Sequence, residues 1–195
     1  MIATFVAFAV VSTGAALVHA SSDDPSSTTT VAGSPTTTVE VPRITTTTIK
    51  PADIKLPRRR VQIAFVRVVL NEQQAYFYNK KRKLIAKLPV STGLDGSTPI
   101  GTFKVFSRSK NTFYTERPQE KMHFMTRFTV GRNGGNIGFH GIPYVISKQG
   151  RIPFPTPLGV APSSHGCIRM LDAHAEWVFN NLPRGATVTV TRSRR

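Results

Sequence analysis

Cysteine is almost missing from this sequence: one residue, Cys167, among 195. A single cysteine excludes an intramolecular disulfide framework and every zinc site built from paired cysteines. The thiol lies in the segment PSSHGCIRM, residues 162–170, which is polar and rich in small side chains. A structural cysteine is usually buried in an apolar run, whereas this composition is typical of an accessible turn.

Acidic residues are also scarce, since 10 Asp and Glu stand against 26 Lys and Arg, for a formal net charge of +16. Such an excess indicates anionic partners and says nothing about the fold. The basic residues are scattered along the chain, in Arg58–Arg60, Lys80–Lys83 and Arg192–Arg195, and do not alternate with aromatic residues as in a nucleic-acid platform. We therefore expect a solvated basic surface, no nucleic-acid partner and a monomer. In an exported protein, anionic cell-wall polymers and lipid head groups are the natural neighbours.

No Lys or Arg occurs before Arg43, although the chain begins with an apolar run from Ile2 to Val18. The residues Val18-His19-Ala20 that end this run resemble a signal-peptidase site. About 17 apolar residues are long for a signal peptide and slightly short for a membrane span. Residues 1–20 are thus predicted to be a signal peptide or an N-terminal membrane anchor. Both alternatives place the rest outside the cytoplasm, in the cell wall or periplasmic space, either secreted or anchored.

Aromatic residues are absent from the next stretch, which is dominated by Thr, Ser and Pro. Such a composition cannot bury enough apolar surface to offset the entropy of ordering, so residues 21–55 are predicted to be a disordered linker. Residues 56–195 remain, about the size of one domain with a hydrophobic core. The sequence shows no internal repeat.

The patterns in this domain favour a mainly β fold with one helix. Strands are predicted at 61–70, 75–79 and 84–93, paired as antiparallel hairpins, and another at 135–141 that carries His140 near its end. Apolar residues at helical spacing from Leu171 to Leu182 predict one amphipathic helix, with Asp172 capping its first turn. Residues 186–191 are predicted to form a closing strand. On the helix, His174 is expected to face solvent and Trp177 to pack in the core.

Three interpretations of Cys167 compete: a small buried residue, a nucleophile and a metal ligand. A catalytic thiol needs a base within hydrogen-bonding reach, and His140 and His165 are the candidates. Residues two apart in an extended segment share a face, but the His165 ring is poorly placed to bond the sulfur of Cys167, so His140 is the preferred base. A zinc site is disfavoured because no second cysteine, nearby acidic residue or H-x-x-x-H pair accompanies these side chains. No metal or other cofactor is expected.

Together these segments resemble the L,D-transpeptidase catalytic domain (YkuD-type) of bacterial cell-wall enzymes. The resemblance runs from about residue 60 to 195 and rests on LPVSTGLDGSTPIGTFKV (88–105), MHFMTRF…IGFHG (122–141) and LG…SSHGCIRM (158–170). It implies a β-sandwich-like fold with the helix after the catalytic cysteine. It also implies that Cys167 attacks a peptidoglycan stem peptide, releases the terminal D-Ala and forms 3-3 cross-links through a thioester.

The same resemblance assigns the site residues. His140 is the base, oriented by the backbone carbonyl of Gly141, and the backbone around Gly166 and Cys167, helped by His165, faces the oxyanion. Arg169, Ser164 and His123 are candidate substrate contacts. Residues 107–121 are predicted to be either a flap over the cleft or an ordinary surface loop. Arg127 and Arg132 either bind an acidic stem peptide or add to the basic surface.

Alternatives to a transpeptidase remain at this point. Water in place of an acceptor amine would make the same site an L,D-carboxypeptidase, and a pocket without turnover would make the protein a non-catalytic peptidoglycan-binding protein. A Cys/His hydrolase of another fold is disfavoured, because in that group the cysteine usually precedes its histidine.

Overall fold

The structure, a computed structural model, describes residues 50–194, so the predictions for residues 1–20 and for most of the linker lie outside the described residues. Ile54 and Leu56 already pack against the core, so the packed region includes the last residues assigned to the linker. No helix within residues 50–194 is long and apolar enough to cross a membrane.

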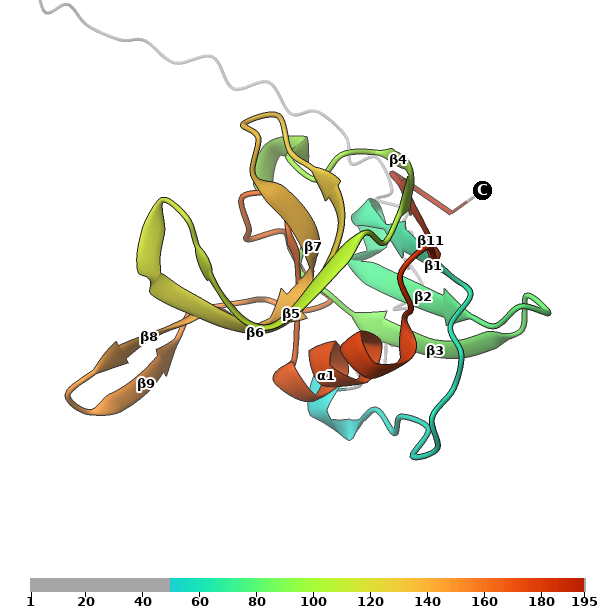
Figure 1. Cartoon of the computed structure of the whole chain (residues 1–195), viewed down its shortest axis with the longest axis horizontal. Helices are drawn as coiled ribbons and strands as arrows, with labels where there is room; N and C mark the ends of the chain where they lie inside the picture. Colours follow the sequence, from blue (N-terminus) through green and yellow to red (C-terminus); the bar gives the residue numbers. More distant parts are fainter. Residues whose placement is uncertain (1–49, 195) are drawn as a thin grey trace, which may run out of the picture. The chain divides into compact units, whose positions relative to one another are not determined.

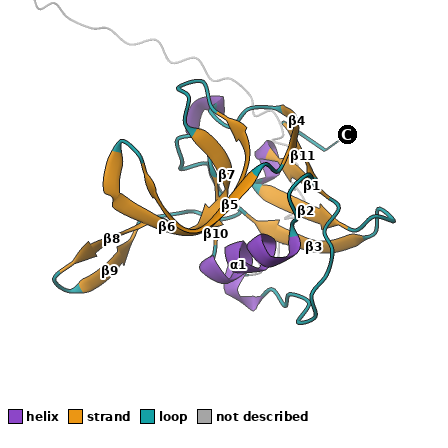
Figure 2. Ribbon diagram, in the orientation of Figure 1, coloured by secondary structure: helices purple, strands orange, loops and turns teal. Residues whose placement is uncertain are grey.

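The fold is mainly β, with one α-helix, as predicted (Figures 1 and 2). Its elements in chain order are η1 (Pro51–Asp53), β1 (Phe65–Val69), η2 (Leu70–Glu72), β2 (Gln74–Tyr78), β3 (Leu84–Pro89), η3 (Leu94–Gly96), β4 (Gly101–Lys104), β5 (Ser107–Tyr114), β6 (Arg117–Val130), β7 (Asn136–Gly141), β8 (Tyr144–Ser147), β9 (Gly150–Pro153), β10 (Ile168–Met170), α1 (Asp172–Asn181) and β11 (Thr187–Thr191).

The first sheet has the order β3-β2-β1-β11-β4. The β1–β2 and β2–β3 pairs are antiparallel, which confirms the predicted hairpins. The last strand, β11, lies between β1 and β4 and runs parallel to β1, with Val66 opposite Val188 and Val68 opposite Val190. The two ends of the domain are therefore joined in the middle of one sheet.

The second sheet has the order β10-β7-β6-β8-β9, with β5 paired to β6. Residues 107–121, predicted to be a flap or a loop, instead form most of the β5–β6 hairpin. The polar sequence did not predict these strands, because much of the hairpin is exposed and shows no alternation of apolar and polar residues.

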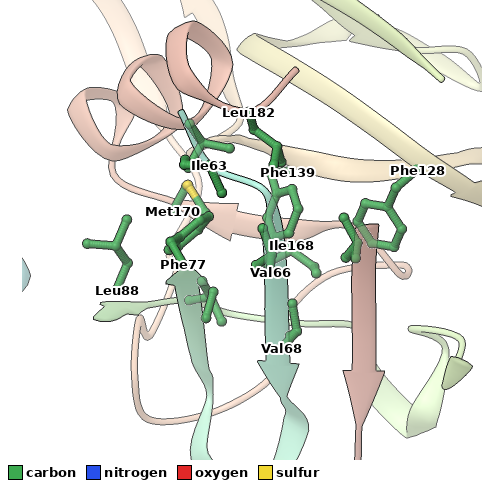
Figure 3. Close-up of a cluster of buried hydrophobic side chains, with 14 of the residues drawn as sticks. Ile63, Val66, Val68, Phe77, Leu88, Phe128, Phe139, Ile168, Met170 and Leu182 are labelled. Carbon is green, nitrogen blue, oxygen red and sulfur yellow. The ribbon is translucent and has the colours of Figure 1, made fainter. Parts of the chain in front are cut away.

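The core lies between the two sheets and beside α1, and Figure 3 shows part of it. Inward residues of the first sheet, such as Val66 and Phe77, share one cluster with Phe139 and Met170 of the second sheet and with Val178 of the helix. Phe77 packs edge-on to Trp177, with ring centroids 5.5 Å apart, which confirms Trp177 as a core residue. Burying such rings provides a large share of the apolar stabilisation.

Two predictions for the helix are wrong. Asp172 is the first helical residue and does not cap the helix, since Leu171 occupies the N-cap without a side-chain hydrogen bond. Instead, Asp172 Oδ2 accepts a bond of 2.7 Å from Arg151 Nη2. His174 does not face solvent: it is 3% exposed, because the helix turns it toward the core together with Ala175 and Val178.

One premise about the basic residues also needs correction. They do not alternate with aromatic residues along the chain, but the first sheet brings the two kinds together in space. Lys87 and Arg194 both lie against the ring of Tyr76, and Arg82 lies over the ring of Phe65. Strand pairing places these residues side by side although they are distant in sequence.

Candidate active site

The segment that carries Cys167 is held by the chain around residues 91–98. Ser163 and Ser164 both donate their backbone N–H to Thr92 O, and Leu94 N–H donates to Ser164 O. The buried Thr98 hydroxyl donates to Gly166 O at 2.8 Å and accepts from Gly93 N–H at 2.7 Å. One threonine thus fixes the residue before the thiol to a second loop.

Gly166 lies where no side chain fits. Its φ is +141°, and a Cβ atom there would be 2.9 Å from Ile137 Cδ1 and 3.0 Å from Ser97 O. Its N–H donates to Ser164 Oγ at 3.0 Å, and the same hydroxyl donates to Cys167 O at 2.5 Å. Ser164 is 2% exposed, so its hydroxyl is engaged inside the loop.

Strand pairing brings His140 and the segment that carries Cys167 together in the second sheet. The strands β7 and β10 are parallel, with Phe139 opposite Ile168 and His140 opposite Arg169. Side chains alternate between the two faces of a sheet, so Arg169 lies on the face of His140. Cys167 comes just before β10, and its sulfur bonds the backbone of Gly138, two residues before His140 on β7. Besides burial, the charge of Arg169 accordingly affects the pKa of both the imidazole and the thiol, and it lowers each.

His140 is 2% exposed, and its Nδ1 donates to Gly141 O at 2.6 Å. Because a carbonyl oxygen only accepts, this bond places the proton of the neutral ring on Nδ1 and the lone pair on Nε2. Burial lowers the pKa of His140 to about 4, despite the opposing effect of the Gly141 carbonyl. At neutral pH the ring is therefore uncharged and has a free basic nitrogen.

Cys167 is half-buried, and its thiol donates to Asn136 O at 3.5 Å. Burial raises the pKa of this thiol, while the backbone of Gly138 and the guanidinium groups of Arg169 and Arg127 oppose that shift. No hydrogen bond joins its sulfur to His140 in the described part of the chain. At rest the thiol and the imidazole are thus both neutral, and catalytic hydrogen bonds commonly tighten only when a substrate binds.

Arg169 is 9% exposed and has few partners for a guanidinium group. Its Nη1 donates to Ser163 Oγ at 3.4 Å, and its Nε is buried without a partner within residues 50–194. Burial lowers the pKa of this group, although arginine remains charged. A buried cation beside the thiol with unused donors is suited to meeting an anionic group.

The two other histidines predicted to belong to the site contact other elements. The ring of His165 stacks on Tyr114 of the β5–β6 hairpin, with centroids 5.4 Å apart, and its Nε2 accepts from Arg117 Nη2 at 3.4 Å. His123 Nε2 lies 2.9 Å from the hydroxyl of Tyr144 and its Nδ1 lies 3.0 Å from Asn111 Oδ1. The hairpin is therefore attached to the cysteine loop through His165, and neither ring is bonded to the thiol.

Two cavities lie away from the thiol and the imidazole. One of about 910 Å³ is lined by residues that include Gly93 and Thr98, which back the cysteine loop, and another of about 620 Å³ lies between Leu56–Arg60 and α1. Neither is lined by Cys167 or His140. Within the described range, no three His, Cys, Asp or Glu side chains are grouped so that they could hold a metal ion.

Four residues at the site were not predicted from the sequence. Asn136 and Gly138 contact the sulfur through their backbones, Thr98 anchors Gly166, and Asp172 packs against Gly141. Contacts that are made by backbone atoms cannot be predicted from the types of the residues. Glycine and proline are frequent in the loop that contains Thr98, at Gly93, Gly96, Pro99 and Gly101. This composition indicates a loop whose backbone closely approaches another segment.

Comparison with known proteins gives consistent results. The model of the YkuD family, described as the L,D-transpeptidase catalytic domain, matches residues 63–190. A curated relative from Bacillus subtilis (strain 168), putative L,D-transpeptidase YciB, is 29% identical over 146 residues, which cover 73% of each chain.

Two solved structures share the fold. LD transpeptidase LdtMt1 in complex with imipenem is 22% identical with a TM-score of 0.52, over 65% of this chain and 58% of that one. An L,D-transpeptidase (Yku) from Stackebrandtia nassauensis is 21% identical with a TM-score of 0.50, over 73% and 60%. The match thus spans about three fifths of each of those chains.

Proposed function

Because the chain belongs to the L,D-transpeptidase catalytic domain family, we propose that it joins peptidoglycan stem peptides by 3-3 links through a thioester on Cys167. The observation that carries this proposal is the β7–β10 pair, which places Arg169 on the face of His140 and has Cys167 just before β10. We further propose that the enzyme works outside the cytoplasm, in the cell wall or periplasmic space, secreted or anchored by its N-terminal segment.

In the first step, the sulfur of Cys167 attacks the carbonyl carbon between the third stem residue and the terminal D-Ala. Nε2 of His140 takes the thiol proton as the S–C bond forms, and the imidazolium then gives a proton to the leaving amine as the C–N bond breaks. The Gly141 carbonyl accepts the hydrogen bond from Nδ1, which leaves Nε2 free to react. Because both groups are neutral at rest, general-base attack fits this site better than a preformed thiolate–imidazolium pair.

The developing oxyanion needs a donor. The Gly166 N–H already donates to Ser164 Oγ, which leaves the N–H of Cys167 as the candidate from this pair of residues. An oxyanion donor typically contributes about 3 kcal/mol to transition-state stabilisation. In this proposal Ser164 and Thr98 hold the loop in shape, and His165 acts through the hairpin that it contacts.

The second step decides the product. Attack on the thioester by an amine of another stem peptide restores the thiol and makes the cross-link, whereas attack by water releases a tripeptide. Unused donors on Arg169 support its role in binding a stem-peptide carboxylate. His123, fixed between Asn111 and Tyr144, is assigned to the substrate-facing side of the second sheet.

The first test is acylation of the full chain by a stem tetrapeptide or a carbapenem, followed by intact mass. We expect a stoichiometric adduct with the wild type, none with Cys167→Ala, and a rate at least about 100-fold lower with His140→Gln. The matched control is His174→Gln, which removes a buried histidine outside the site. A normal adduct on Cys167→Ala would end the proposal.

The second test is incubation with a defined disaccharide-tetrapeptide and mass analysis. A cross-linked dimer supports transpeptidation, and tripeptide alone supports the L,D-carboxypeptidase alternative. An unchanged substrate together with no adduct would support a non-catalytic binding protein. Slow alkylation of the thiol would not separate these cases, since burial raises the pKa of Cys167 in the enzyme itself.

A further inference from the structure

The face of the first sheet that points away from the core carries an unusual set of side chains. Val66, Val68, Phe77 and Val188 point inward, so the residues alternating with them point outward. We call this the outer face. It consists of Phe65, Arg67, Tyr76, Tyr78, Leu84, Lys87, Thr102, Lys104, Thr187 and Thr189.

The strand register places these side chains in two rows. One row runs from Lys87 through Tyr76, Arg67 and Thr189 to Thr102, and the other runs from Leu84 through Tyr78, Phe65 and Thr187 to Lys104. Each row crosses all five strands, which at the usual strand spacing is about 19 Å. The rows lie side by side, so their cations and hydroxyls belong to one surface, which also includes Phe65 and Leu84.

This surface is strongly positive. Arg82 adds to Arg67, Lys87 and Lys104. Arg194 is paired with Glu72, and the Glu72 carboxylate also accepts from the Tyr76 hydroxyl. Lys80, Lys81 and Lys83 extend the charge at the tip of the β2–β3 hairpin. Threonine hydroxyls lie between the cations, and Lys104 Nζ donates to Thr187 Oγ1 at 2.7 Å.

The aromatic rings on the outer face are not free to stack on a ligand. Phe65 and Tyr78 stack on each other with centroids 4.7 Å apart, and Arg82 lies over Phe65. Tyr76 is 4% exposed and lies between Lys87 and Arg194. Single-stranded nucleic acid needs open ring faces for its bases, so this arrangement is suited to charge and hydroxyl contacts instead.

We propose that the outer face binds a linear polyanion with phosphodiester repeats, the kind of polymer that bacterial envelopes contain. Charge complementarity over five strands, hydroxyl donors and a flat extended shape all fit such a chain. A lipid surface fits less well, since Leu84 is the one large apolar side chain with high exposure in these five strands. The outer face lies across the core from the second sheet, so a bound polymer leaves Cys167 accessible.

The test compares two triple variants of the full chain that lose the same charge. Arg67→Gln/Lys87→Gln/Lys104→Gln removes cations from the outer face, and Lys110→Gln/Lys148→Gln/Arg184→Gln removes exposed cations elsewhere. The probe is synthetic poly(glycerol phosphate), with dextran as the neutral polymer. We expect the dissociation constant to rise at least about tenfold for the first variant and less than about threefold for the second, with a shallower salt dependence only for the first.

Several outcomes would overturn the proposal. One is that the two variants weaken polymer binding equally. Another is that a single-stranded oligonucleotide binds the outer face more tightly than the polymer does. A third is that the first variant loses binding to anionic lipid vesicles but not to the polymer. The single variant Lys87→Gln provides a second test if the triple variant is unstable. Acylation of Cys167 by a carbapenem should be the same in all variants, so a failure here is distinguishable from a failure of the proposed enzyme activity.

Discussion

Gly141 shows how tightly single residues determine this site. A Cβ atom at its position would clash with Asp172 Oδ1 and lie 3.0 Å from Asp172 Cγ, so the Asp172 side chain or the strand would have to move. Its carbonyl also fixes the tautomer of His140. The same residue therefore affects stability, through the helix start, and chemistry, through the imidazole.

Gly141→Ala is expected to destabilise the protein by about 1–3 kcal/mol, because Asp172 or the strand must move to admit the methyl group. Urea unfolding measures this. Gly135→Ala is the matched control, since a Cβ atom at that position would have no heavy atom within 4 Å, and it should change little. If the two variants were equally stable, the contact with Asp172 would not constrain this position.

The lowered pKa of His140 predicts a pH dependence of stability. The unfolded ring titrates near 6.5 and the folded ring near 4, so between these values the unfolded state binds more protons. Stability should therefore fall as pH drops from about 6.5 to 4, by about 3 kcal/mol from this group. Burial lowers the pKa of His174 as well and adds in the same direction.

Urea unfolding of wild type and His140→Gln at pH 7 and pH 4.5 separates this contribution from that of other titrating groups. The variant should lose less stability on acidification than the wild type. An equal loss in both proteins would contradict the assigned environment of His140.

At the scale of elements, the loop from Ser91 to Thr98 positions the cysteine segment as much as β10 does. Residues 163–166 are bound by one backbone group of Thr92, one backbone group of Leu94 and the hydroxyl of Thr98. A loop that is held in this way by buried hydrogen bonds keeps the thiol in place without a bulky side chain nearby.

Thr98→Val is expected to cost about 2–4 kcal/mol, since it leaves the buried Gly93 N–H and Gly166 O unpaired. It should also slow acylation of Cys167 by a carbapenem. Thr102→Val removes an exposed hydroxyl and is the control. Unchanged acylation by a stably folded Thr98→Val would show that the link to Gly166 does not position the thiol.

The elements differ in how far the sequence predicted them. The strands β1, β2 and β11 were predicted because each is rich in β-branched or aromatic residues, β3 because it follows a polar turn, and α1 because its apolar residues repeat at helical spacing. The β5–β6 hairpin was not, because much of it is polar and exposed and shows no alternation of apolar and polar residues. The pairing of Cys167 with His140 was a prediction from family resemblance, whereas the backbone contacts of the sulfur could not be inferred from residue types.

At the scale of the whole molecule, positive charge is poorly compensated. The chain has 26 basic and 10 acidic residues, and residues 50–194 contain three ion pairs. The sequence established this excess but not its placement, because only the fold gathers Arg67, Lys87 and Lys104 on one face.

Like-charge repulsion predicts that salt stabilises the protein. Raising NaCl from 20 to 200 mM should raise Tm by about 2–5 °C, because screening of the charges changes strongly over this range. Replacing Lys80, Lys81 and Lys83 by Gln should reduce that increase. A melting temperature that is independent of salt in both proteins would mean that repulsion is negligible.

The parallel pairing of β1 with β11 has a consequence for biogenesis. Among the described residues, β11 follows all the other strands in the chain, so the first sheet is incomplete until residues 187–191 have been synthesised. Until then the core lacks Val188 and Val190, which lie on the strand between β1 and β4, and the growing chain cannot complete it.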